Sequence, residues 1–133
     1  MIGREHRDLQ KYFFIALGGA FGSVARYLVG TTISNRLGIR FPFGTFVINI
    51  SACLIIGFAL EVLNRHTDFN PALRYLIPSG FIGAYSTFST FEWEIFSSLN
   101  SGAVWIAIAY VASSLVFGLI AVALGAALGR AVS

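Results

Sequence analysis

The chain has 133 residues and a formal net charge of +3; 56% of the residues are hydrophobic and 11% are charged. This length accommodates one domain, and the apolar excess excludes an ordinary soluble fold and favours an integral membrane protein. The nine Lys and Arg residues lie between hydrophobic segments and form no basic face, which argues against a nucleic-acid partner. Cys53 is alone and the two histidines lack ligand spacing, so we expect no enzyme and no zinc site.

The hydrophobic pattern predicts an all-α membrane protein that forms a single membrane domain, residues 1–133. A membrane-spanning helix needs roughly 20 apolar residues, so the chain has room for four spans joined by short loops. The predicted spans cover residues 12–33, 43–63, 72–99 and 103–128.

The first predicted span carries a small-residue face and one arginine. Gly18 and Gly22 are one turn apart, a spacing that lets two helix backbones approach closely in lipid. Arg26 lies past the middle of the apolar run, where its charge either snorkels to the interface or faces an aqueous vestibule.

Asn49 is the strongly polar side chain at depth in the second predicted span. Its amide either bonds a neighbouring helix or donates to a permeating anion. The sequence of this span does not decide between the two roles.

The third predicted span contains Pro78, several glycines and two tandem Ser-Thr-Phe triplets. These features are typical of a broken membrane helix, and we expect the break at mid-membrane around Gly83–Thr87. On a helix that restarts there, Phe88 and Phe91 share one face, beside the hydroxyls of Ser86, Thr87, Ser89 and Thr90.

The fourth predicted span follows a tight turn at Asn100-Ser101-Gly102, so it is expected to lie antiparallel to the third. Tyr110 and Ser114 are one turn apart and extend the set of hydroxyls, whereas Gly118, a further turn along, does not. Ser113 and Ser114 have an alternative role, because a serine in a membrane helix often bonds its own backbone.

Lys and Arg residues are unevenly divided between the two membrane sides that an even number of spans predicts. The loops and termini on one side carry Arg4, Arg7, Lys11, Arg65, Arg74 and Arg130, and the other side carries Arg36 and Arg40. This bias favours termini in the cytoplasm.

The predicted polar groups at depth include no carboxylate; Glu61, Glu92 and Glu94 lie near span ends. Hydroxyl and amide protons, together with the electropositive edges of phenylalanine rings, suit a small, hard anion such as fluoride. Two other hypotheses stay open. One is a small dual-topology multidrug or cation exporter, which would need a mid-membrane acid. The other is a non-transporting assembly subunit.

Three motifs together resemble the Fluc/CrcB fluoride channel family over nearly the whole chain. They are Gly-Gly-x-x-Gly-x-x-x-Arg-Tyr (Gly18–Tyr27), Phe-Gly-Thr-x-x-x-Asn (Phe43–Asn49), and Gly80-Phe81-x-Gly83 leading into Ser86–Phe91.

The resemblance implies a passive channel that exports fluoride and gives fluoride resistance, in a bacterial inner (plasma) membrane. It implies an antiparallel, dual-topology homodimer with two pores. The fluoride pathway would contain Asn49, Phe88, Ser89, Thr90, Phe91, Tyr110 and Ser114. Arg26 and Glu94 would border the vestibules, and the backbone carbonyls of Gly83 and Ser86 would hold a structural sodium ion at the dimer centre. The dual topology that the resemblance implies predicts little charge bias, unlike the distribution of Lys and Arg along this chain.

Overall fold

The computed structural model describes residues 2–38, 40–66 and 68–132, with side chains from Leu9 onward. Within these residues every regular element is helical. Three helices are long and apolar enough to cross a membrane: α1 (Ile2–Leu37, apolar from Leu9), α2 (Phe43–Arg65) and α6 (Val104–Val132). The expectation of an all-α fold with membrane-spanning helices is confirmed at this level.

The third hydrophobic segment consists of several helical pieces. They are α3 (Ala72–Arg74), the π-helical η1 (Tyr75–Ile82), α4 (Gly83–Tyr85) and α5 (Phe88–Asn100). Pro78 has no backbone N–H and lies inside η1, where hydrogen bonds to the fifth residue back replace the α-helical pattern. The helix is interrupted at Ser86 and Thr87, whose ψ angles of 160° and 118° are extended.

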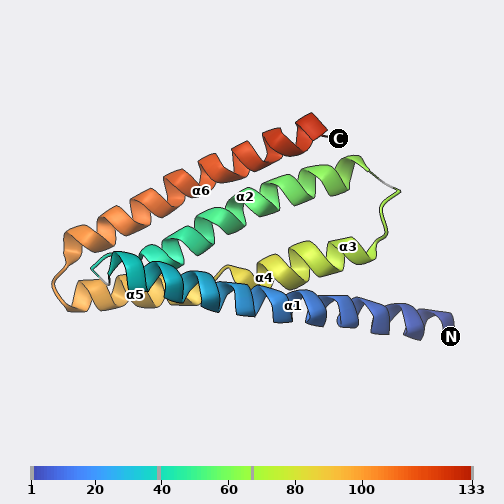
Figure 1. Cartoon of the computed structure of the whole chain (residues 1–133), viewed down its shortest axis with the longest axis horizontal. Helices are drawn as coiled ribbons and strands as arrows, with labels where there is room; N and C mark the ends of the chain where they lie inside the picture. The colour runs from blue at the N-terminus through green and yellow to red at the C-terminus, as the bar shows by residue number, and fades with distance from the viewer. Residues whose placement is uncertain (1, 39, 67, 133) are drawn as a thin grey trace.

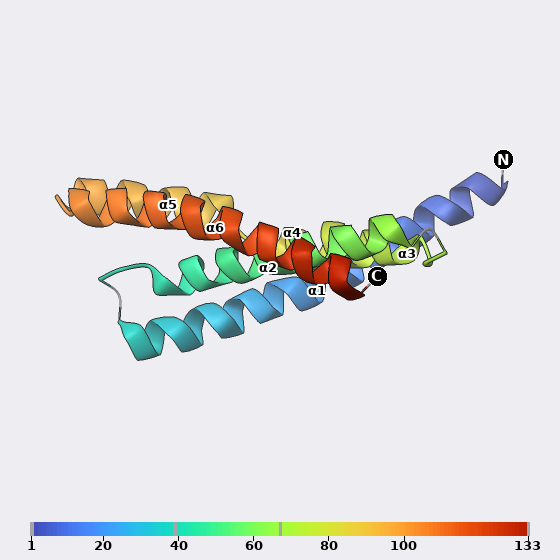
Figure 2. The ribbon, with the colours of Figure 1, turned by 90° about the horizontal axis from the view of Figure 1, so that it is seen from above.

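The helices run up and down along one long axis, and both termini lie at the same end (Figure 1). At the other end Gly102, with φ of 78°, makes the turn that returns the chain from α5 into α6. In the view from above, α5 and α6 lie together on one side and the C-terminal half of α1 on the other, with α2 between them (Figure 2). The bundle is therefore splayed at this end, opposite the termini.

Glycines set the closest helix contacts. A Cβ on Gly18 would overlap the carbonyl oxygen of Leu76, so α1 and η1 meet backbone against backbone. Gly125 of α6 faces the carbonyl of Leu54 in the same way, which brings α6 against α2. Such approaches are the main source of helix association in lipid, where no hydrophobic force pulls helices together.

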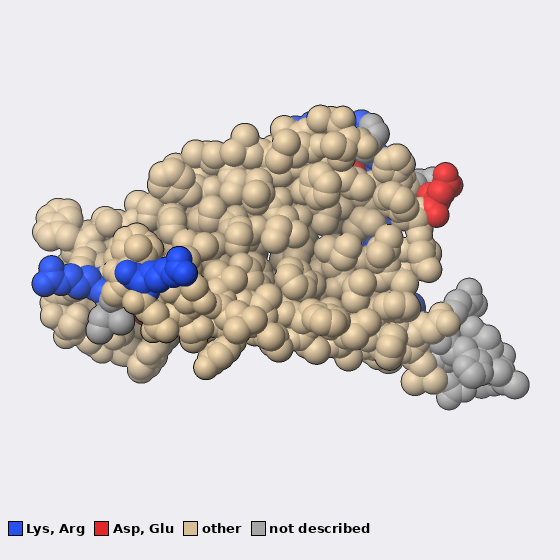
Figure 3. Space-filling model, viewed as in Figure 1, with Lys and Arg blue, Asp and Glu red and all other residues tan. Residues whose placement is uncertain are grey.

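Charged side chains lie toward the two ends of the face seen in Figure 3, and a broad uncharged band separates them. At the end with the termini, Glu61 of α2 pairs with Arg65 at 2.8 Å and with Arg130 of α6 at 3.4 Å. Arg74 reaches back from α3 to Asn64 Oδ1 at 3.0 Å. The side chains of Arg4 and Arg7, which contribute to the predicted charge bias, lie outside the described residues.

Gly18→Ala and Gly19→Ala form a matched test of the α1–η1 contact. The first methyl group would overlap backbone, whereas the nearest atom to the second is the Ala84 Cβ at 3.9 Å. We expect Gly18→Ala to lower the free energy of unfolding by about 1–3 kcal/mol and Gly19→Ala to leave it nearly unchanged. Thermal unfolding in detergent micelles measures both, and equal losses would contradict the close approach of α1 and η1 at Gly18.

Candidate functional site

Asn49 of α2 pairs with the extended backbone at the helix interruption. Its Oδ1 accepts the Thr87 N–H at 3.0 Å, and its Nδ2 donates to the Thr87 carbonyl at 3.2 Å. Asn49 therefore bonds a neighbouring segment, which is one of the two roles that the sequence left open for it. The amide has two N–H groups, so one remains to donate elsewhere.

The same pairing changes the hydrogen bonding of the carbonyls around the interruption. In a continuous helix the Thr87 N–H would bond the carbonyl of Gly83, and the Thr90 N–H that of Ser86. Here Thr87 N–H donates to Asn49, and Thr90 N–H donates to the Thr87 side chain at 3.3 Å. Gly83 and Ser86 therefore have carbonyl oxygens without their α-helical donors, at the two positions predicted to bind a cation.

The aromatic rings of α5 are unequally buried. Phe88 is 73% exposed, whereas Phe91 is half-buried and meets the ring of Tyr110 edge-on at 4.8 Å. The Phe88 and Phe91 rings are 6.1 Å apart. The structure thus brings three predicted pathway residues into one aromatic group, with Ser89 and Thr90 exposed on the same turn.

Glu94 occupies a hydrogen-bonded cluster that the sequence did not predict. Thr45 of α2 donates to one carboxylate oxygen at 2.7 Å, and Tyr110 of α6 donates to the other at 2.8 Å. Thr45 is 7% exposed and Tyr110 is completely buried. Thr45 is one turn before Asn49, so this helical spacing was the available clue to its inward position.

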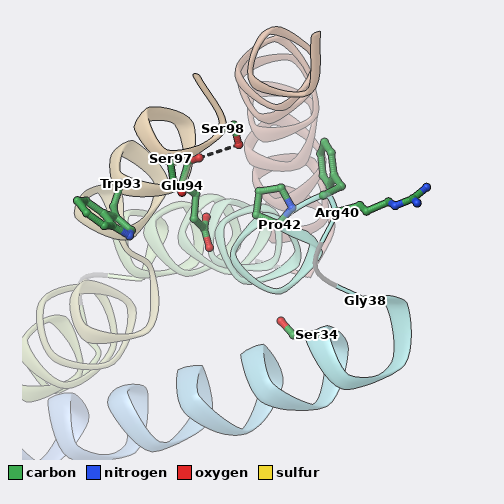
Figure 4. Close-up of a pocket in the computed structure, with 9 residues that line it drawn as sticks. Ser34, Gly38, Arg40, Pro42, Trp93, Glu94, Ser97 and Ser98 are labelled. Atoms are coloured by element: carbon green, nitrogen blue, oxygen red, sulfur yellow. Dashed lines mark hydrogen bonds between the residues drawn. The ribbon is translucent and has the colours of Figure 1, made fainter. Parts of the chain in front are cut away.

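A polar pocket of about 220 Å³ opens beside Glu94 at the splayed end (Figure 4). Glu94 points into it from α5 and Ser34 from α1, while Arg40 is directed away. The predicted vestibule residue Arg26 is half-buried and is not among the lining residues. Arg26 and Glu94, the two residues expected to border the entrances, therefore do not line the same pocket.

A second pocket, of about 350 Å³, lies along the interruption. Its lining includes Asn49, Ser86, Thr87 and Phe88, and also Cys53, which had no predicted role. Predicted cation-site and pathway residues thus share one surface. The described residues contain no group of three or more His, Cys, Asp or Glu that could hold a metal. The hard ligands at this surface are backbone, amide and hydroxyl oxygens.

The two adjacent serines of α6 differ. Ser113 Oγ donates to its own backbone at Tyr110 O, 3.3 Å away. Ser114 Oγ is buried and has no hydrogen-bond partner among the described residues. The self-bonding alternative therefore holds for Ser113, while the buried Ser114 hydroxyl is unsatisfied among the described residues.

The fold and this surface define a multi-pass helical membrane protein in which an amide, hydroxyls and aromatic rings gather at the interruption of a helix. The family model described as "CrcB-like protein, Camphor Resistance (CrcB)" matches residues 13–126. The chain belongs to this family.

Curated bacterial relatives carry the name "Fluoride-specific ion channel FluC". The protein from Acidobacterium capsulatum is 53% identical over 120 residues, which cover 90% of this chain and 96% of the relative. That from Solibacter usitatus is 48% identical over 120 residues, with coverage of 90% and 98%. A relative from Chloroflexus aurantiacus is 43% identical over 116 residues, with coverage of 87% and 92%.

Glu94→Gln tests the carboxylate cluster, with Glu92→Gln as its control. An amide has one oxygen, so either Thr45 or Tyr110 would lose its acceptor. We expect thermal unfolding in detergent to show a loss of about 1–2 kcal/mol for Glu94→Gln. Glu92 is exposed and, among the described residues, forms no hydrogen bond or ion pair, so its variant should match the parent. Identical unfolding of the two variants would contradict the cluster.

Proposed function

We propose that the protein is a fluoride-selective channel that lets fluoride leave the cell passively across the bacterial inner membrane. The observation that carries the proposal is 53% identity, over nearly the whole of both chains, to a relative named as a fluoride-specific ion channel. The alternative of a multidrug or cation exporter is not favoured by these relatives.

Fluoride would pass along the surface formed by α2, the start of α5, the part of α6 that carries Ser114, and the partner's helices. The second N–H of Asn49 and the hydroxyls of Ser89, Thr90 and Ser114 are donors that can replace water around a small anion. The electropositive ring edges of Phe88 and Phe91 add attraction without a fixed positive charge. Selectivity then comes from pathway width and donor spacing.

The proposed assembly is an antiparallel homodimer with two pores. Phe88 is 73% exposed beside the polar groups of Asn49 and Ser86, and lipid would penalise those polar groups. A second copy covers this surface and closes the pathway. The third hydrophobic segment would then cross the membrane as well, in addition to α1, α2 and α6. Its helix interruption would lie at the dimer centre. The proposal includes insertion of the chain in both orientations. The uneven distribution of Lys and Arg between the two predicted membrane sides opposes this part of it.

A structural sodium ion at the dimer centre is part of the same proposal. The fit rests on Gly83 and Ser86, whose carbonyl oxygens lack their α-helical donors because Thr87 and Thr90 donate elsewhere. Carbonyl oxygens are hard ligands suited to sodium. When bound, the ion would neutralise partial negative charge where two helix breaks meet.

The pocket at Glu94 is the proposed aqueous entrance. The carboxylate is held by Thr45 and Tyr110, so it lines the mouth in a fixed position. Arg26 would border the pathway elsewhere, where the partner subunit approaches α1.

Purified protein in liposomes loaded with potassium fluoride provides the test. On addition of valinomycin we expect rapid fluoride release, measured with a fluoride electrode, and retention of chloride in matched liposomes. Equal release of chloride, or no release of fluoride, would contradict the proposal. Proton-driven uptake of organic cations would instead support the exporter.

Phe88→Ala should reduce fluoride release at least about tenfold, because one ring edge that faces the anion is lost. Phe21→Ala is the matched control, since Phe21 is 64% exposed on α1 and is not one of the proposed pathway residues. The same electrode assay compares the two variants. Equal rates would remove Phe88 from the pathway.

A further inference from the structure

Two side chains of α2 hold the chain on either side of the helix interruption. Asn49 pairs with Thr87, which precedes α5. Ser51 Oγ lies 2.9 Å from the hydroxyl of Tyr85, the last residue of α4. Ser86, between these two anchors, carries one of the carbonyls proposed to bind sodium. Ser51 and Tyr85 have no role in the proposed anion pathway.

The direction of the Ser51–Tyr85 hydrogen bond follows from proton counting. Ser51 Oγ donates its one proton to the Ile48 carbonyl, 3.0 Å away. The Tyr85 hydroxyl must therefore be the donor to Ser51. The hydrogen bonds run from Tyr85 to Ser51 and then to Ile48, in one direction.

Tyr85 is well placed to transmit a constraint to the backbone. It is 6% exposed, and its ring stacks on Phe81 with centroids 5.6 Å apart and an interplanar angle of 14°. A buried phenol needs an acceptor, and Ser51 supplies it. With the ring held on both its face and its hydroxyl, the backbone at Tyr85 has little freedom to rotate.

We propose that the Ser51–Tyr85 hydrogen bond is a positioning contact that holds the Gly83 carbonyl of α4 in place relative to the Ser86 carbonyl and so determines sodium affinity. The inference rests on the proposed function. Asn49 fixes the residue after Ser86, and Tyr85 fixes the residue before it. The Ser86 carbonyl shares a planar peptide group with the Thr87 N–H, so the Asn49 bond to that N–H sets its direction. The Gly83 carbonyl belongs to α4, which Tyr85 anchors. Loss of the Tyr85 anchor allows α4 and its Gly83 carbonyl to turn, while the Asn49 pairing keeps the Ser86 carbonyl in place.

Tyr85→Phe, Ser51→Ala and the double variant test this contact in the full-length protein. Tyr85→Phe keeps the ring on Phe81 and removes the hydroxyl, so we expect the sodium concentration for half-maximal thermal stabilisation to rise about fivefold. Ser51→Ala should raise it further, since it leaves the buried Tyr85 hydroxyl without an acceptor. Adding Tyr85→Phe to Ser51→Ala should restore the value of Tyr85→Phe alone.

Hydrogen exchange gives a second readout, which does not depend on conduction. Peptides covering residues 82–90 should exchange faster in Tyr85→Phe than in the parent, and by a larger factor in sodium than in N-methylglucamine. Tyr12→Phe is the matched control, because Tyr12 is 68% exposed on α1 and should leave both readouts unchanged.

An unchanged sodium midpoint in Tyr85→Phe would overturn the inference, as would a parent protein without sodium-dependent stabilisation. If Tyr85→Phe lost the same stability with and without sodium, the contact would contribute only to packing, and the inference would again be overturned. Fluoride release by the parent, measured in parallel, separates the two proposals. No release contradicts the proposed function, whereas release with an unchanged midpoint contradicts only the positioning role.

Discussion

The pairing between the Asn49 amide and the Thr87 backbone is the interaction on which the rest of the site depends. A buried, extended residue inside a membrane helix leaves polar backbone groups that lipid cannot solvate. Asn49 satisfies both of them from a neighbouring helix. With Thr87 held in this conformation, its own hydroxyl caps the start of α5 and Phe88 emerges at the surface. One side chain thus fixes the break, the helix restart and the aromatic group.

In the proposed function, the same arrangement would let a short segment serve ions of opposite charge. The interruption deprives two carbonyls of their helical donors, which favours a cation at Gly83 and Ser86. Immediately beyond it lie hydroxyls, an amide and ring edges, which favour an anion. The surfaces that favour a cation and an anion are thus separated by the arrangement of polar groups, without a charged side chain at depth. The pocket at the splayed end contains the Glu94 carboxylate, and Thr45 and Tyr110 hold it in place.

Close glycine packing makes this site possible in a chain of 133 residues. Gly18 lets α1 contact the backbone of η1, and Gly125 lets α6 contact the backbone of α2. At these points no side chain lies between the helices. The opposite end of α1 diverges from α5 and leaves the polar pocket beside Glu94. Tight contact in one part and divergence in another follow from where the small residues lie.

The amino-acid sequence by itself determined the helical membrane class and the family, because hydrophobic length and motif spacing are properties of the linear chain. It also placed an expected break near Gly83–Thr87, from Pro78, the glycines and the hydroxyl triplets. The tertiary structure alone decided that Asn49 bonds Thr87, that Thr45 and Tyr110 hold Glu94, and that Ser113 and Ser114 differ. It also separated Arg26 from the Glu94 pocket. These features depend on the rotation and register of one helix against another, which side-chain packing sets in three dimensions and no single segment encodes.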